Sequence, residues 1–100
     1  MVHALVADAA VARAIAASFE EEGVPVTVER VAGAALVLAR RAAREAPAGI
    51  GIGGDAERLV IVLAAAAGTA YVERPTAEAR LVGTCAARLV RRCPLPFPIA

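Results

Sequence analysis

Short runs of β-type residues alternate with alanine-rich stretches of helical period, and this order restricts the folds open to a chain of 100 residues. The β-type runs occupy residues 2–7, 24–30, 48–54, 58–63 and 70–74, and the helical stretches occupy residues 9–22, 32–47 and 76–92. The predicted order is therefore β-α-β-α-β-β-β-α. Strand–helix–strand units favour parallel neighbours, whereas the short link between residues 54 and 58 predicts an antiparallel hairpin.

This order predicts a three-layer α/β/α fold with a mixed five-stranded sheet. Right-handed crossovers would place the first two helices on one face of a mostly parallel sheet, unless the strand order reverses. No internal repeat or flexible linker interrupts the pattern, so residues 1–100 are expected to form a single domain.

The first helix has clear start and stop signals. Val11, Ile15 and Phe19 recur at the four-residue spacing of one buried helical face. Asp8 is a favourable N-cap residue, and Gly23 supplies the left-handed conformation that commonly ends a helix. The predicted helix therefore ends at the residue before Gly23.

Composition limits the classes of protein to consider. The chain is 59% hydrophobic, but it contains only three aromatic residues and one Met, so we expect a modest core and some stabilisation by a partner. A net charge of +1 does not steer the chain towards nucleic acid or acidic membranes. The uncharged run at residues 59–72 is too short to span a bilayer, and Asp8 interrupts the apolar start too early for a signal peptide.

The two cysteines are predicted to be reduced. Cys85 and Cys93 lie eight residues apart in one predicted helix, or about 12 Å along its axis, which is too far for a disulfide. Reduced thiols and the lack of a signal peptide favour a cytoplasmic protein.

A glycine-rich stretch matches a known nucleotide-binding pattern but fails its context. Gly49, Gly51 and Gly54 have the G-x-G-x-x-G spacing of a dinucleotide-binding loop. That loop requires a helix immediately afterwards, whose amides meet the pyrophosphate, but here a strand follows. We expect these glycines to allow close packing of a helix on the strand and to form a turn.

The sequence contains few side chains suited to nucleophilic or acid–base catalysis. His3 is the only histidine and Ser18 the only serine, and a nucleophilic triad would need the first strand and the first helix to bring them together. Asp55, Glu57 and Glu73 lie near strand ends, so a carboxylate pair stays open, although nothing in their spacing favours one. The chain is therefore predicted not to be an enzyme.

Three glutamates occupy the unfavourable end of the first helix. Glu20, Glu21 and Glu22 precede Gly23, where the helix dipole presents partial negative charge. They form either a solvated helix end or a cation-binding or partner-binding site. Successive helical residues differ by 100°, so at most two of the three share a site. Because Mg²⁺ takes several oxygen ligands, any metal here would have to be shared with another chain.

A cluster of arginines ends the last helix. Arg88, Arg91 and Arg92 carry charges that favour the C-terminal end of the helix dipole. An acidic partner surface is the alternative interpretation.

The order and spacing of several segments resemble the small subunit of the diol/glycerol dehydratase reactivating factor. The resemblance covers about residues 15–97. It is carried by the segments SFEEEGVP (18–25), ARRAAREAPAGIGIGGD (39–55), LVIVL (59–63) and GTCAARLVRRCP (83–94). It implies a fold like that of the dehydratase medium subunit and of class II anticodon-binding domains.

The resemblance also implies a function. Reactivating factors are chaperones that release damaged cobalamin from coenzyme B12-dependent dehydratases, and their large subunit is an Hsp70-like ATPase. The small subunit binds that large subunit and exchanges with the dehydratase medium subunit, without binding cobalamin directly. In this family the middle glutamate of the triplet contributes to a Mg²⁺ site shared with the large subunit. The matching residue is Glu21, which leaves Glu20 and Glu22 as solvated neighbours.

Two rival functions remain open. The chain could be a free-standing α/β module that binds a nucleotide or RNA, or an accessory subunit of the dehydratase itself. The partner that co-purifies would distinguish them: the ATPase subunit, the dehydratase large subunit or RNA. Diol or glycerol dehydratase as the client, the stoichiometry and association with a microcompartment are left open by the residues.

Overall fold

The computed structural model describes residues 1–66 and 68–92 and confirms the predicted order of elements. These are β1 (Val2–Val6), α1 (Ala9–Glu22), β2 (Val26–Arg30), α2 (Ala35–Glu45), β3 (Ile50–Gly54), β4 (Arg58–Leu63), β5 (Ala70–Pro75) and α3 (Ala79–Arg91), with 3₁₀ turns at Ala64–Ala66 and Thr76–Glu78. Helices α2 and α3 begin three residues later than predicted, after Gly33 and after the second 3₁₀ turn respectively. The predictions for Cys93 and the tail fall outside the described residues.

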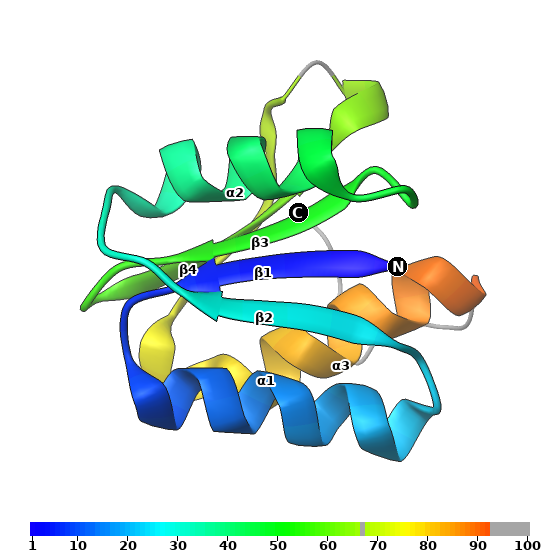
Figure 1. Cartoon of the computed structure of the whole chain (residues 1–100), viewed down its shortest axis with the longest axis horizontal. Helices are drawn as coiled ribbons and strands as arrows, with labels where there is room; N and C mark the ends of the chain where they lie inside the picture. Colours follow the sequence, from blue (N-terminus) through cyan, green and yellow to red (C-terminus); the bar gives the residue numbers. More distant parts are fainter. Residues whose placement is uncertain (67, 93–100) are drawn as a thin grey trace.

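The sheet is mixed, as predicted, with the strand order β2-β1-β3-β4-β5. Strand β1 pairs in parallel with both β2 and β3, whereas β4 pairs antiparallel with both β3 and β5. There are thus two antiparallel pairs rather than the one expected. Because β2 and β3 flank β1 on opposite sides, the crossover direction reverses at β1 and places α1 and α2 on opposite faces. Figure 1 shows α2 above the sheet and α1 with α3 below it.

The larger core lies between the sheet and the α1/α3 layer. Phe19 is its largest fully buried side chain, and Ile15 from the same helix is also fully buried. They pack with apolar side chains from the strands and from α3, including Val2, Val6, Ile52, Leu59, Ile61, Val82, Cys85 and Ala86. Val90 of α3 is 37% exposed, because the helix turns that position away from the core.

On the opposite face, α2 lies very close to β3. A Cβ atom on Gly51 would come within 2.2 Å of the amide nitrogen of Ala43, and one on Gly53 within 2.1 Å of the carbonyl oxygen of Ala35. Only glycine leaves room for the α2 backbone at these two positions. The prediction that these glycines allow a helix to approach the strand is therefore confirmed.

No helix within the described part of the chain is long and apolar enough to cross a membrane.

Candidate interface at the C-terminal end of helix α1

The end of α1 is closed by its own backbone. Gly23 has a φ of 70°, and its amide donates to the carbonyl of Glu20 at 3.1 Å, while the amide of Val24 donates to the carbonyl of Phe19 at 3.0 Å. This pair of hydrogen bonds is a Schellman motif, which satisfies two of the carbonyls that a helix end leaves free. The predicted glycine stop is confirmed, and it holds the three glutamates in the last helical turn.

Glu22 is not a solvated neighbour. Its side chain is only 18% exposed, and its Oε1 lies 3.2 Å from Nε of Arg88 and 3.5 Å from Nη1 of Arg91. Arg91 Nη1 also donates to the backbone carbonyl of Glu22 at 3.0 Å. The expectation of a solvated Glu22 is therefore wrong, because α3 brings two arginines to the end of α1.

Glu21 points outward and meets a different arginine. Its Oε1 pairs with Nη2 of Arg80, near the start of α3, and the two side chains are 63% and 56% exposed respectively. The backbone carbonyl of Arg80 accepts a hydrogen bond of 2.8 Å from the buried hydroxyl of Ser18. This contact holds the backbone of Arg80 in place beside the Glu21–Arg80 ion pair. Glu20, the first of the three glutamates, is exposed.

Three arginines pair with the glutamates at the end of α1, and the sequence alone did not assign them to this place. Arg80, Arg88 and Arg91 lie about 60 to 70 residues beyond the glutamates, as their sequence separations of 59, 66 and 69 show. One signal could have found Arg88 and Arg91, which lie in the last turn of α3. Two helix ends of opposite charge in one small domain are favourable neighbours, since each partly neutralises the other.

The Mg²⁺ site implied for Glu21 can be tested against these residues. An exposed carboxylate at a helix end suits one position in the shell of a hard cation. Among residues 1–66 and 68–92, no group of three His, Cys, Asp or Glu side chains could hold a metal ion. The exposed carboxylate of Glu21 can supply one oxygen ligand, as a site shared with another chain would require. A cation bound there would compete with Arg80 for this carboxylate.

A first prediction concerns Glu22 and the two arginines that it contacts. Replacing Glu22 by Gln should lower the free energy of unfolding by about 1 kcal/mol, because two arginines then lose a common partner in a half-buried network. Urea denaturation measures this change. Glu20→Gln, on an exposed side chain of the same turn, is the matched control and should change stability by less than about 0.5 kcal/mol. Equal effects of the two variants would contradict a structural role for the pair.

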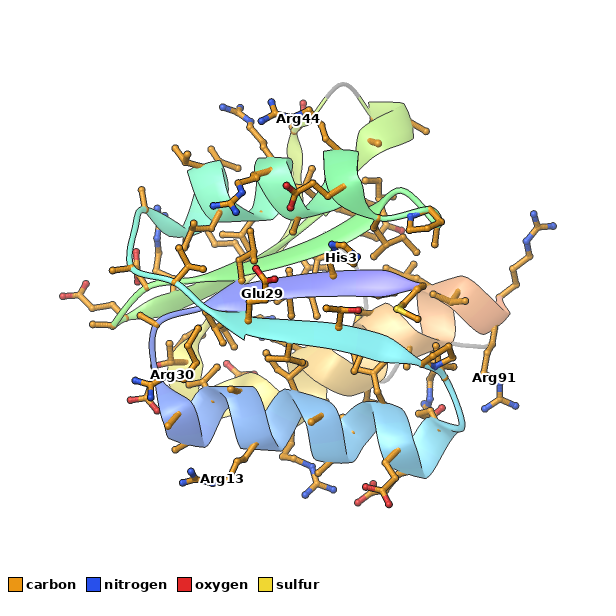
Figure 2. The ribbon with its side chains drawn as sticks, viewed as in Figure 1. His3, Arg13, Glu29, Arg30, Arg44 and Arg91 are labelled. Carbon is orange, nitrogen blue, oxygen red and sulfur yellow. The ribbon has the colours of Figure 1, made fainter. Side chains whose placement is uncertain are left out.

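The only serine and the only histidine lie on opposite faces of the sheet. Val2, Ala4 and Val6 of β1 face the α1/α3 core, so the alternation of the strand turns His3 towards the α2 side, as Figure 2 shows. Ser18 is buried between α1 and α3. The sheet therefore separates the two groups that a triad would need together.

The acidic residues near the strand ends have structural partners. The pKa of Asp55 is lowered from 3.8 because its carboxylate accepts hydrogen bonds from the amides of Arg58 and Glu57, with the amide of Ala35 acting in the same direction. Ala35 is the first residue of α2, which has no side-chain N-cap of its own. Glu73 pairs with Arg58. These contacts favour structural roles over catalytic ones.

Cys85 is fully buried in the larger core, and burial raises its pKa to about 11. A thiol in this environment is a poor nucleophile, because the thiolate is the reactive form. The prediction that Cys93 is reduced falls outside the described residues.

Comparisons with known proteins identify relatives over nearly the whole chain. The family model described as dehydratase medium subunit matches residues 1–96. A structure described as "Glycerol dehydratase reactivase" superposes with a TM-score of 0.81 at 25% identity and covers 96% of each chain. "Structure of diol dehydratase-reactivating factor complexed with ADP and Mg2+" gives 0.82 at 28% identity, again with 96% coverage of each chain. No curated protein matches significantly.

The fold predicted from periodicity and the family predicted from the residues are both confirmed by these matches. The charged end of α1 lies within the matched region. The chain thus belongs to the dehydratase medium subunit family, and within it the matches support the small subunit of a reactivating factor.

Proposed function

We propose that this chain is the small subunit of a chaperone-like reactivating factor for a coenzyme B12-dependent diol or glycerol dehydratase. The observation that carries the proposal is the match to two reactivase structures over 96% of each chain, together with a family model of the dehydratase medium subunit. One fold that serves both a reactivase and a dehydratase subunit can occupy similar interfaces in both assemblies.

The proposed mechanism is an exchange of partners. This chain binds the ATPase subunit of the factor and takes the place of the medium subunit on the dehydratase, so that damaged cobalamin can leave. Exchange requires two interfaces of comparable strength, since about 1.4 kcal/mol shifts the partition between them tenfold. The nucleotide state of the large subunit can supply such a bias. The chain itself performs no chemistry in this scheme and acts in the cytoplasm.

We further propose that Glu21 faces the large subunit and contributes one carboxylate to a Mg²⁺ ion shared with it. The support is the exposure of its side chain and the Mg²⁺ named in the description of the related factor's structure. A bound cation would link the two subunits by ligands from both. In this chain, Arg80 holds the carboxylate of Glu21 in place when the cation is absent.

The test is co-expression with the ATPase subunit, followed by affinity measurements with and without EDTA. We expect Glu21→Ala to weaken the complex and to abolish its dependence on Mg²⁺. Arg80→Ala is the matched control, because it breaks the same ion pair but keeps the carboxylate. It should retain the dependence on Mg²⁺ and lower the Mg²⁺ concentration required.

The outcomes separate the two parts of the proposal. If wild type and Glu21→Ala bound the ATPase subunit with the same affinity, and EDTA changed neither affinity, the shared metal would be excluded. The proposed chaperone role would be unaffected by that result. Failure to bind the ATPase subunit under any condition would contradict the chaperone role itself.

An accessory subunit of the dehydratase is the second candidate, favoured by the description of the family model. Under that function, the chain would co-purify with the dehydratase large subunit as a stable stoichiometric component. A nucleotide-binding module is disfavoured by the packing of Gly51 and Gly53 against α2, which leaves no space for a phosphate at those glycines. ATP or NAD should therefore leave the melting temperature of the isolated chain unchanged.

A further inference from the structure

Two arginines of α2 differ from most others in the described chain. Six arginines pair with glutamates: Arg41, Arg58, Arg74, Arg80, Arg88 and Arg91. Arg40 and Arg44 do not pair with any carboxylate of residues 1–66 and 68–92, although α2 also carries Glu45. They lie one helical turn apart and are both exposed on the same side of α2. Figure 2 shows Arg44 on the outer side of α2, away from the sheet.

These two arginines line one cavity. It has a volume of about 270 Å³ and lies between α2 and the segment that follows β4. Ala43 and Val62 contribute apolar surface and are themselves 2% and 0% exposed, and Ala64 and Gly68 complete the lining. Two arginines therefore line a small hollow to which the described residues contribute no carboxylate.

Arg40 is held in place before any ligand binds. Its Nε donates a hydrogen bond of 2.7 Å to the carbonyl of Gly68. This uses one of the five N–H donors of the guanidinium and leaves both terminal nitrogens available. A side chain that is already oriented loses less conformational entropy when a ligand binds.

The position of Arg40 is not explained by the helix dipole. Arg44 lies in the last turn of α2, where a cation offsets the partial negative charge of the helix end. Arg40 lies a full turn earlier, and the effect of the dipole falls off beyond the last turn. A second cation beside the first costs repulsion unless an anion lies between them.

We propose that Arg40 and Arg44 together bind a small oxyanion, a carboxylate or a phosphate group, in this cavity. Guanidinium groups bind both anions through paired, charge-assisted hydrogen bonds. The exposed apolar side chain of Ala64 would receive the carbon or ester side of the ligand. The site lies on the face of the sheet opposite α1, so it is independent of the function proposed for Glu21.

The test is an NMR titration of the isolated chain with sodium phosphate and, separately, sodium acetate, with chloride used to keep the ionic strength constant. We expect saturable shifts of the Arg40 Nε–H and Gly68 amide resonances, with a dissociation constant of about 1–10 mM for two exposed contacts. Arg40→Gln and Arg44→Gln should each weaken binding about tenfold, the loss of one charge-assisted contact. The ratio of the two affinities decides between phosphate and carboxylate.

Arg41→Gln is the matched control, because Arg41 lies between the two on the same helix but pairs with Glu45 and does not line the cavity. It should bind both anions as the wild type does. Circular dichroism checks that each variant is folded. Linear, non-saturable shifts in the wild type, or an equal loss of binding in Arg41→Gln, would overturn the proposal.

Discussion

Replacing Gly53 by Ala should lower the free energy of unfolding by roughly 3–5 kcal/mol, a large share of the stability of a small domain. A methyl group there would come within 2.1 Å of the carbonyl oxygen of Ala35 and 2.2 Å of the amide nitrogen of Ala39. Both are backbone atoms of α2, so no side chain can turn aside to relieve the overlap. Either α2 moves away from the sheet or β3 bends, and both responses disrupt the packing between them.

Urea denaturation followed by circular dichroism measures this loss. Gly51→Ala should behave similarly, since its Cβ would approach Ala43 N at 2.2 Å. Gly23→Ala is the control, because a Cβ at Gly23 meets nothing within 4 Å and only the φ of 70° is unfavourable. It should cost about 1–2 kcal/mol. A Gly53→Ala variant as stable as Gly23→Ala would show that α2 can move away without loss.

Replacing Phe19 by Ala should cost about 3–5 kcal/mol, the range found for deleting a buried aromatic side chain. Phe19 is fully buried and is the largest such side chain in the core between α1, α3 and the sheet. A chain with so few large side chains has little else with which to fill the space. The cavity that remains would sit directly beneath the end of α1 that carries Glu21 and Glu22.

Thermal and urea unfolding measure the effect, and binding to the proposed partner, the ATPase subunit, provides a second measurement. Val37→Ala is the control, because Val37 is 61% exposed and its truncation should cost less than about 0.5 kcal/mol. If Phe19→Ala lost less than about 1 kcal/mol, the core of α1 would be far more adaptable than its burial indicates. At temperatures and urea concentrations below its unfolding midpoint, we expect Phe19→Ala to bind the ATPase subunit more weakly than the wild type. Val37→Ala should bind as the wild type does.

Local patterns were sufficient to predict which segments form strands and helices. The spacing of Val11, Ile15 and Phe19 predicted a buried helical face, and all three residues are buried. The start signal at Asp8 was also correct: its Oδ1 accepts hydrogen bonds from the amides of Ala10 and Val11 at 2.7 and 3.2 Å. These features depend on neighbours within a few residues, which the sequence displays directly.

The arrangement of strands depends on contacts that the local sequence does not display. Nothing within β1 indicates that it pairs with both β2 and β3, so the reversal that separates α1 from α2 could only be left open. The same limit explains the error at Glu22. Its partners Arg88 and Arg91 are near only because α3 packs on α1, whereas the family resemblance assigned the site to Glu21 and left Glu22 solvated.

The strand reversal at β1 has a further consequence for this fold. Open α/β sheets customarily receive ligands in the crevice where two neighbouring strands send their connections to opposite faces, beyond the carboxyl ends of those strands. Here β3 continues into the antiparallel hairpin to β4 instead of into a crossover, and groups of the chain itself lie beyond the carboxyl ends of β1 and β3. The amide of Ala7 donates to the carbonyl of Gly54 at 3.3 Å, and Nη2 of Arg30 donates to the carbonyl of Ala7 at 3.1 Å. Asp55 supplies the negative charge at the start of α2 that a phosphate would otherwise provide. Contacts within the chain therefore occupy the end of the sheet at which open α/β folds customarily bind ligands.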